Sequence, residues 1–367
     1  MNWPIIESNN GIKVRINDQD LLNFTSNDYL GLAQNIELKE TMATAINKYG
    51  LGSTGSRRLS GNHRLFLDTE ESIASWIGKE SAVMFNSGYQ MNVSIFSTIV
   101  SKSTLVIADK LIHASLVDGI QSSDAQLVRF RHNDTGHLAQ LLKKYAHNYS
   151  DILIVCESVY SMDGDTAPIH EIIQLKNDYQ ARLLVDEAHS IGLFGEGGNG
   201  WVNEKGILNE VDILLVPFGK AFGLSGAMFL SNQELAARLK AKCRGYIYST
   251  ALPLPVAIGI KEASKIIQSS QSLRQNLQQN IQAFKSQLDT ISDSQIQPII
   301  IGDNNQASSC EKSLIEAGFF VRAVHHPTVP KGQSRLRITL TACHTVDEVL
   351  ALAHQIKTVL SPVGSLA

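Results

Sequence analysis

The sequence predicts an α/β fold, with a mostly parallel central sheet followed by a smaller C-terminal α+β domain. Short apolar runs alternate with helix-like segments through the central part of the chain, and polar or ionisable residues follow several of these runs directly. After about Ile260, a long polar helical pattern leads into further strand patterns. We therefore expect an N-terminal segment (1–45), a large domain (46–260) and a C-terminal small domain (261–367).

Four apolar runs have the composition of buried parallel strands. They are TLVIAD (104–109), ILIVCE (152–157), RLLVDE (182–187) and DILLVP (212–217). Strands that are apolar on both faces belong to parallel sheets with helices on each side. Helical patterns lie between them, such as HASLVDGIQ and APIHEIIQLKNDYQ. The central part is therefore predicted to be an open sheet covered by helices.

Ionisable residues stand at the carboxyl ends of these predicted strands. They are Asp109, Glu157, Asp186 with Glu187, and Lys220 shortly after the last strand. In open α/β sheets, ligands bind outside the carboxyl ends of the strands. We therefore expect these groups to converge on one site.

Lys220 is the only charge between Ile213 and Leu230, a stretch that approaches the length of a membrane span. A lysine at the centre of a bilayer would cost roughly 2.5 to 3.5 kcal/mol, and Pro217 and several glycines interrupt any helix. The stretch is therefore expected to form a strand, a tight turn and a strand. An ion pair, a lowered pKa or a covalent imine would each explain such a lysine. A side chain that reaches the surface or neutralises a carboxylate is the structural alternative.

Two further segments have the pattern of a binding site. In AVMFNSGYQMN (82–92), Ser87, Gly88 and Tyr89 fall where a strand gives way to a helix, which suits a phosphate group but equally an ordinary turn. In VDEAH, Asp186 ends a strand and His189 follows three residues later. A metal site with His113 is a minority alternative, because no motif such as HExxH supports it.

Two matches to GxGxxG appear, at Gly50 to Gly55 and at Gly195 to Gly200. The dinucleotide fingerprint needs a strand directly before it and a helix directly after it. The first match follows a helical pattern, and the second lies well past the nearest strand. We expect both to be tight turns.

In RLRITLT, alternation places Arg335, Arg337 and Thr339 on one face of a strand. Two arginines on one face can bind a carboxylate in fork geometry. A solvated edge face with basic residues is the alternative that this pattern alone slightly favours.

The composition argues against several function classes. The chain has 35 acidic and 32 basic residues and a formal net charge of -3. Proteins that bind nucleic acid or anionic membranes carry a clear excess of Lys and Arg, which this chain lacks. Its four cysteines form no CxxC pair, which argues against a disulfide scaffold or structural zinc. The first residues show no secretory signal, so we expect a cytoplasmic protein.

A family resemblance runs from about Asn23 almost to the C-terminus. Its motifs are SNDYLGL, GSTGSRRLSG, FNSGYQMN, ADKLIHASL, ESVYSMDGD, VDEAHSIGLFGEGG, FGKAFGLSGA, YIYSTALP and RLRITLT. In combination they resemble the α-oxoamine synthases, which use pyridoxal 5'-phosphate and have the aspartate-aminotransferase fold, fold type I. The resemblance implies that the large domain binds the cofactor.

The resemblance implies catalytic roles for four residues. Lys220 matches the lysine that forms a Schiff base with the cofactor and then removes the α-proton of the amino acid. Asp186 matches the carboxylate paired with the pyridinium nitrogen, which keeps the ring a strong electron sink. His189 matches the residue near the ring 3'-oxygen, and His113 the imidazole that stacks on the ring.

The resemblance also indicates which residues bind the phosphate of the cofactor. Gly88 and Tyr89 fall where backbone groups meet it. Ser249 and Thr250 correspond to a segment that reaches the phosphate of a partner subunit, which implies a homodimer with shared sites.

Four more residues are expected at the same site. Glu157 and Ser161 line it, and Asn27 lies in the motif at its opening. Arg337 matches the arginine that holds the substrate carboxylate, which favours the functional explanation of that strand face. Pro217 departs from the usual pattern, which has a small hydroxyl residue there.

Within the family, HNDTGHL, QPIIIGDNNQA and HPTVPKGQSRLRITLTACH resemble the biotin-pathway member. That resemblance implies a decarboxylative condensation of L-alanine with a pimeloyl thioester carried by coenzyme A or an acyl-carrier protein. The alternatives are another α-oxoamine synthase, such as a glycine-using C-acetyltransferase or a 5-aminolevulinate-type synthase, and a non-catalytic partner subunit. The last is disfavoured because such subunits would lack Lys220.

Overall fold

The computed structural model describes residues 4–361 and divides the chain into two compact units. The large unit comprises Ile36–Tyr160 and Thr166–Ser269. The small unit comprises Met1–Asn35, Ser161–Asp165 and Ser270–Ala367. The leading residues therefore belong to the same unit as the C-terminal part.

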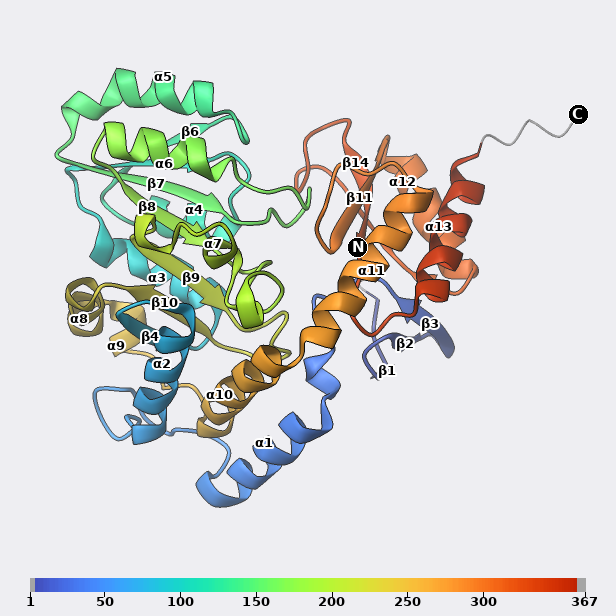
Figure 1. Cartoon of the computed structure of the whole chain (residues 1–367), viewed down its shortest axis with the longest axis horizontal. Coiled ribbons are helices and arrows are strands. Elements are labelled where there is room, and N and C mark those ends of the chain that lie inside the picture. Colours follow the sequence, from blue (N-terminus) through green and yellow to red (C-terminus); the bar gives the residue numbers. More distant parts are fainter. Residues whose placement is uncertain (1–3, 362–367) are drawn as a thin grey trace, which may run out of the picture. The chain divides into compact units, whose positions relative to one another are not determined.

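A seven-stranded sheet forms the centre of the large unit, in the order β4-β10-β9-β8-β7-β5-β6 (Figure 1). Its strands are β4 Ser81–Phe85, β5 Thr104–Asp109, β6 Gln126–Phe130, β7 Asp151–Glu157, β8 Arg182–Asp186, β9 Ile213–Pro217 and β10 Ala227–Ser231. β5 to β9 pair in parallel, and β10 runs antiparallel to both of its neighbours. The predicted fold class, with a mostly parallel sheet, is confirmed.

Helices cover both faces of this sheet, as its apolar strands require. They are α1 Ile36–Tyr49, α2 Arg64–Ile77, α3 Gly88–Ile99, α4 Ala114–Gln121, α5 Thr135–Tyr145, α6 Ile169–Asp178, α7 Trp201–Glu204, α8 Gln233–Lys242, α9 Arg244–Ile247 and α10 Leu254–Ser269. α3 packs on β4, β9 and β10 together with α4, α8 and α9, and the shared core includes Phe96, Leu116 and Phe229. α5 packs on β5 and β6, and α6 on β8.

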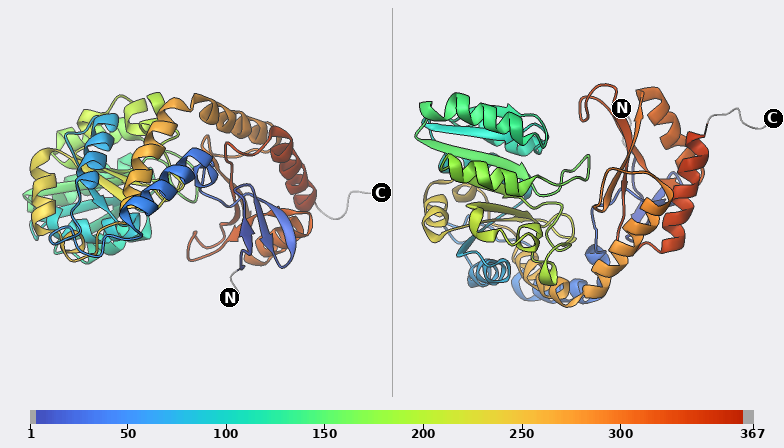
Figure 2. Two further views of the ribbon diagram at one scale, coloured as in Figure 1. Left: turned by 90° about the horizontal axis from the view of Figure 1, so that it is seen from below. Right: turned by 45° about the horizontal axis from the view of Figure 1, so that its top comes forward.

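The small unit is built from helices and strands that pair antiparallel, apart from β12, which pairs in parallel with β3. Its strands are β1 Ser8–Asn9, β2 Lys13–Ile16, β3 Gln19–Asn23, β11 Ile296–Gly302, β12 Phe319–Phe320, β13 Arg322–Val324 and β14 Ser334–Thr339. β14 lies between β11 and β13 in one sheet, and β12 joins β1 to β3 in another. Its helices are α11 Gln271–Gln287, α12 Asn304–Glu316 and α13 Val346–Leu360. α12 packs against the β11-β14-β13 sheet, and α13 contacts both other helices (Figure 2).

Two helix boundaries are well defined in the small unit and at its junction with α10. The long helical pattern after Ile260 is interrupted at Ser270, where α10 gives way to α11. The last helix, α13, begins with a capping box, since Thr345 Oγ1 accepts from the Glu348 N–H at 3.2 Å and the Glu348 carboxylate accepts from the Thr345 N–H at 2.8 Å.

The apolar stretch around Lys220 is the predicted strand, turn and strand, namely β9 and β10 with the turn between them. No helix among residues 4–361 is both long and apolar enough to cross a bilayer. Neither GxGxxG match connects a strand directly to a helix. The first follows α1, and the second contains a 3-10 turn at Glu196–Gly198 before α7.

Candidate active site

Asp186 is the centre of a buried polar cluster at the carboxyl end of β8. Asp186 is only 3% exposed. The Ala188 N–H donates to Oδ1 at 2.9 Å, and Asn92 Nδ2 donates to Oδ2 at 3.3 Å. Burial raises the pKa of Asp186, while the Lys220 ammonium and these donors lower it. A carboxylate in this environment is stabilised by any further cation or donor that reaches it.

Lys220 follows β9 and lies in the same cluster. Its Nζ is 2.8 Å from Nε2 of His189, which is 3% exposed. Protonated lysine and histidine nitrogens can only donate hydrogen bonds. At least one of the two side chains must therefore be neutral to accept the bond. The pairing brings together the two residues that the sequence separates by 31 positions.

His113 connects the cluster to helix α4, which it precedes as the N-cap residue. Its Nδ1 lies 2.7 Å from Ser115 Oγ, and Ser115 Oγ accepts from Asn92 Nδ2 at 2.9 Å. A chain of polar groups therefore runs from His113 through Ser115 and Asn92 to Asp186. Burial lowers the pKa of His113, and the Asp186 charge raises it. The imidazole is thus favoured in its neutral form.

Glu157, at the end of β7, accepts the backbone N–H of His113 at Oε1. It is 2% exposed, and burial followed by the charge of Asp186 raises its pKa to about 8. The predicted convergence therefore holds for Glu157, Asp186 and Lys220, which interact through their charges.

The other two acids at strand ends do not join this cluster. Asp109 accepts from the backbone N–H groups of Leu111 and Asn133 at 2.7 and 2.9 Å and shapes its own loop. Glu187 accepts from the Val202 N–H at 2.6 Å, so it binds the start of α7. The hydrogen bonds of these two acids do not reach the cluster, although, in addition to burial, the Asp109 charge raises the pKa of Glu157 and the Asp186 charge raises the pKa of Glu187.

Helix α3 supplies the candidate phosphate position. Ser87 is its N-cap, with Oγ accepting from the Gln90 N–H at 3.2 Å. Gly88 and Tyr89 stand in the first turn, where backbone N–H groups have no intrahelical acceptor. A Cβ on Gly88 would lie 3.1 Å from the ring of Pro217, so this close approach favours glycine. The Tyr89 ring is 56% exposed, and its hydroxyl donates to Asp118 at 2.7 Å.

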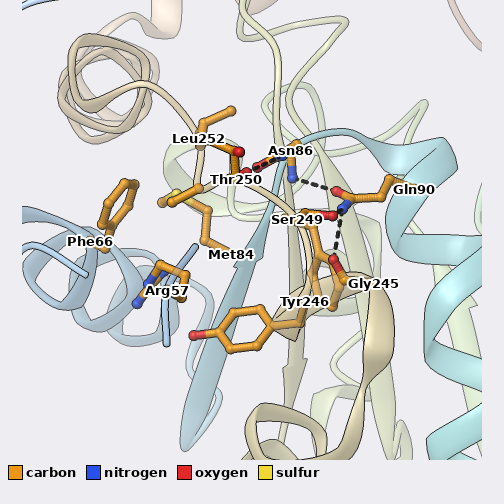
Figure 3. Close-up of a pocket in the computed structure, with 12 residues that line it drawn as sticks. Arg57, Phe66, Met84, Asn86, Gln90, Gly245, Tyr246, Ser249, Thr250 and Leu252 are labelled. Carbon is orange, nitrogen blue, oxygen red and sulfur yellow. Dashed lines mark hydrogen bonds between the residues drawn. The ribbon is translucent and has the colours of Figure 1, made fainter. Parts of the chain in front are cut away.

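The segment with Ser249 and Thr250 lies beside the start of α3 (Figure 3). Asn86 Nδ2 donates to the Thr250 carbonyl at 2.7 Å, and Gln90 Nε2 donates to Ser249 Oγ at 2.6 Å. The structure therefore joins the segment with Ser249 and Thr250 to Asn86 and Gln90, which flank the predicted Gly88 and Tyr89.

Arg337 is the centre of a second cluster, within the small unit. Its Nε donates to the Ser161 carbonyl at 2.7 Å, and its Nη2 to Asn27 Oδ1 at 3.3 Å. The buried Tyr29 hydroxyl also donates to Asn27 Oδ1, at 3.1 Å. Ser161, Asn27 and Arg337, which the sequence predicts at one site, are thus in contact with one another, and Ser161 contributes its carbonyl oxygen.

Arg335 has a different environment, although it shares a strand with Arg337. It is 1% exposed, and its Nη1 pairs with the Asp163 carboxylate at 2.6 Å. Its strand β14 is the central strand of its sheet. The alternative of a solvated edge face is therefore wrong.

Several polar residues of these clusters were not predicted from the sequence, namely Asn86, Gln90, Asn92, Ser115 and Tyr29. The segment NSGYQMN holds three of them. Polar side chains at one-turn spacing after a strand-to-helix junction are the available signal, because residues four apart share a helix face.

The metal alternative has no support in the described part of the chain. Among residues 4–361, no three His, Cys, Asp or Glu side chains are grouped so that they could hold a metal ion. The pairing of His189 with Lys220 accounts for that histidine instead.

Comparison with known proteins agrees with this geometry. The chain belongs to the aminotransferase class I and II family, whose sequence profile matches residues 19–356. It is 40% identical over 348 residues to the 8-amino-7-oxononanoate synthase of Vibrio cholerae, covering 94% of this chain and 89% of the relative. The 8-amino-7-oxononanoate synthase of Buchnera aphidicola is 38% identical over 357 residues, with coverage of 96% and 92%.

Solved structures extend the similarity to the fold. A serine palmitoyltransferase from S. paucimobilis with bound PLP matches with a TM-score of 0.93 and 29% identity, covering 97% of this chain and 92% of that chain. An 8-amino-7-oxononanoate synthase from Francisella tularensis matches with a TM-score of 0.80 and 32% identity, covering 92% and 97%. The resemblance predicted from the motifs, and the type I fold, are confirmed.

Proposed function

We propose that this chain is an enzyme that catalyses the pyridoxal-phosphate-dependent, decarboxylative condensation of L-alanine with a pimeloyl thioester, the 8-amino-7-oxononanoate synthase reaction. A carbon–carbon bond forms between the alanine α-carbon and the thioester carbonyl, and the carbon–sulfur bond breaks to release the thiol. The alanine carboxylate leaves as carbon dioxide, and a proton takes its place. The observation that carries the proposal is Lys220 beside His189 and the buried Asp186, in a chain about 40% identical to enzymes of this name.

The residues present fit pyridoxal phosphate. The Asp186 carboxylate is buried with one short and one long hydrogen bond, so a protonated ring nitrogen would offset the cost of its burial. The first turn of α3 offers backbone donors to a phosphate, and Lys220 offers an amine to an aldehyde. His113, exposed beside this cluster, offers a flat ring to stack on another.

When bound, pyridoxal phosphate supplies a pyridinium ring that takes up the electron pair left on the α-carbon. Asp186 would hold the proton on the ring nitrogen, which would keep the ring positively charged. Lys220 Nζ would take the proton from the α-carbon of alanine and later return one. His189, which lies 2.8 Å from Lys220 Nζ in this structure, would donate a hydrogen bond to the ring 3'-oxygen.

Neutral side chains around Asp186 serve to hold the ring rather than to change its charge. His113 would cover one face of the ring and exclude water from it, and Ser115 and Asn92 fix the imidazole. The raised pKa of Glu157 keeps that carboxyl protonated near neutral pH, so that it does not compete with Asp186 for the ring's positive charge.

Arg337 binds the carboxylate of alanine. Its Nε is held by the Ser161 carbonyl and its Nη1 by Thr339 Oγ1 at 2.9 Å, which orients the guanidinium plane. Asn27 accepts from Nη2 and is the group that a substrate carboxylate would displace or share. Arginine suits this role because it is charged at every relevant pH.

The protein acts as a homodimer in this proposal. Ser249 and Thr250 bind the phosphate held by Gly88 and Tyr89 of a second copy, so each site draws on two chains. The pimeloyl group arrives on coenzyme A or on an acyl-carrier protein, and the reaction takes place in the cytoplasm.

The test is a comparison of substrate pairs with the purified holoenzyme. L-alanine with pimeloyl-coenzyme A, glycine with acetyl-coenzyme A and glycine with succinyl-coenzyme A are assayed side by side for thiol release, and the product is identified by mass spectrometry. We expect the first pair to have the highest kcat/KM. A clear preference for a glycine pair would show another α-oxoamine synthase, and a colourless protein that takes up no cofactor would contradict the enzyme assignment.

A further inference from the structure

The Gln90 side-chain amide has an orientation that its partners determine (Figure 3). The Asn86 backbone N–H donates to Gln90 Oε1 at 2.9 Å, and a backbone N–H can only donate. Gln90 Nε2 donates to the Gly245 carbonyl at 2.9 Å, and a carbonyl can only accept. The oxygen and nitrogen of this amide therefore cannot exchange places.

This orientation determines the hydrogen-bonding role of Ser249. Gln90 Nε2 makes its other bond to Ser249 Oγ at 2.6 Å, so the serine oxygen accepts there. A serine hydroxyl has one proton and can otherwise act as donor or acceptor toward a neighbour. Because Gln90 offers it only N–H, the Ser249 proton is directed to an acceptor other than Gln90.

A phosphate oxygen is such an acceptor, since an ionised phosphate offers lone pairs. Thr250, the residue next to Ser249, is held in a similar way. Asn86 Nδ2 donates to the Thr250 carbonyl, and the exposed Thr250 side chain lies outside this network. The same amide also joins this segment to the first turn of α3, next to Gly88 and Tyr89.

We infer that Gln90 is a positioning residue that presents the Ser249 hydroxyl as a hydrogen-bond donor to the phosphate of the cofactor held by a second copy of the chain. The inference rests on the proposed function, because it assumes that the segment containing Ser249 meets a phosphate. It adds a specific role to a residue whose side chain binds Asn86, Gly245 and Ser249. A purely structural role would instead affect every ligand of the site equally.

The experiment compares a ligand with the phosphate and one without it. Full-length protein freed of cofactor is titrated with pyridoxal phosphate and with pyridoxal, and Kd is measured by absorbance. We expect Gln90→Met to raise the Kd of pyridoxal phosphate roughly 10-fold, the size expected for one hydrogen bond to a charged group, and to change the Kd of pyridoxal less than about twofold. Gln90→Glu should weaken pyridoxal phosphate further, because its carboxylate would accept the Ser249 proton.

A double-mutant cycle tests the route through Ser249. Ser249→Ala should raise the Kd for pyridoxal phosphate about as much as Gln90→Met, and combining the two should add little. Gln140→Met is the matched control, because Gln140 is exposed on α5 and far along the chain from this network. Its Kd values should equal those of the wild type.

Three results would overturn the inference. They are an equal loss of affinity for both ligands, additive effects of the two substitutions, and an unchanged Kd in Ser249→Ala, which decides the question even if Gln90 variants fold poorly. Each leaves the proposed function intact as long as the wild type binds pyridoxal phosphate and forms the expected product. A wild-type protein that binds no pyridoxal phosphate would contradict the proposed function and this inference together.

Discussion

The cluster around Asp186 in the large unit and the arginines of β14 in the small unit treat buried charge in opposite ways. In the large unit, Glu157 and Asp186 are buried with few donors, and burial raises the pKa of both. In the small unit, Arg335 and Arg337 are each held by several oxygens that belong to backbone carbonyls, hydroxyls, amides and one carboxylate. In the first arrangement, the carboxyl groups can gain or lose a proton near neutral pH. In the second, a permanently charged guanidinium group is held in a fixed position.

This difference matches two tasks that one enzyme has to perform. Proton transfer requires groups whose charge changes during the reaction, and burial is the means of shifting their pKa. Recognition of a carboxylate requires a fixed charge in a fixed plane, which a well-anchored arginine provides. Substitutions in the two units should therefore impair different properties of the protein.

The largest effect is expected at Lys220 in the large unit. Lys220→Ala removes the amine that binds the cofactor and moves the α-proton, so kcat should fall by roughly 10³-fold or more. Borohydride reduction of the wild-type holoenzyme should fix the cofactor to Lys220, as peptide mass spectrometry would show, and Lys220→Ala should abolish that label.

Lys79 provides the matched control for this prediction. It is another half-buried lysine whose pKa burial lowers, but its Nζ donates to the carbonyls of Leu208 and Val211. Lys79→Met should lose stability and still fix the cofactor on Lys220. A label that moves to Lys79 or persists in Lys220→Ala would show that the assignment of the reactive lysine is wrong.

The next effect is expected in the stability of the small unit. Arg335→Met leaves the Asp163 carboxylate without its ion-pair partner, and breaking a buried pair in this way typically costs about 3 to 5 kcal/mol. Urea unfolding should show this loss in the free energy of unfolding. Arg322→Met removes a more exposed pair with Glu311 and should cost about 1 kcal/mol or less. Similar losses in both variants would contradict the contrast.

Arg337→Lys should affect recognition instead of stability. A lysine keeps the charge but loses the planar fork, so KM for L-alanine should rise roughly 10- to 100-fold, while the Kd for pyridoxal phosphate should not change. Arg322→Lys is the control, because Arg322 lies directly opposite Arg337 on β13. A fall in cofactor affinity without a change in KM would assign Arg337 to the cofactor rather than to the substrate.

The sequence predicts the parts of this molecule that depend on local patterns. The buried parallel strands follow from apolar runs, and Asp186 and Lys220 follow from charges at their ends. Glu187 shows the limit, because neighbouring side chains along a strand point to opposite faces and its partner Val202 lies 15 residues away. Gln90 shows it more strongly, since its partner Ser249 is 159 positions distant and nothing local indicates the contact.

Glu187 also offers a smaller test of the large unit's adjustable charges. It is fully buried, its Oε1 accepts from the Val202 N–H, and its Oε2 has no hydrogen-bond partner among residues 4–361. Burial raises its pKa from an ordinary value of 4.5 to about 8. The folded chain therefore holds a proton on Glu187 that the unfolded chain releases between these two pH values.

Stability should consequently fall as pH rises from about 4.5 to 8, because the folded state binds the extra proton in this range. One such group contributes at most about 1.4 kcal/mol per pH unit. Glu187→Gln keeps the acceptor for Val202 and removes the ionisation, so its free energy of unfolding should decline less steeply over this range. Urea unfolding of the cofactor-free protein at pH 5, 6, 7 and 8 measures both slopes.

Glu71→Gln is the control for this experiment, because Glu71 is exposed on α2 and should leave the slope unchanged. Glu157 has a pKa raised in the same direction, so part of the wild-type slope should remain in Glu187→Gln. Parallel curves for the wild type and Glu187→Gln would mean that Glu187 is ionised in the folded chain. In that case the adjustable charges of the large unit would be limited to the cluster around Asp186.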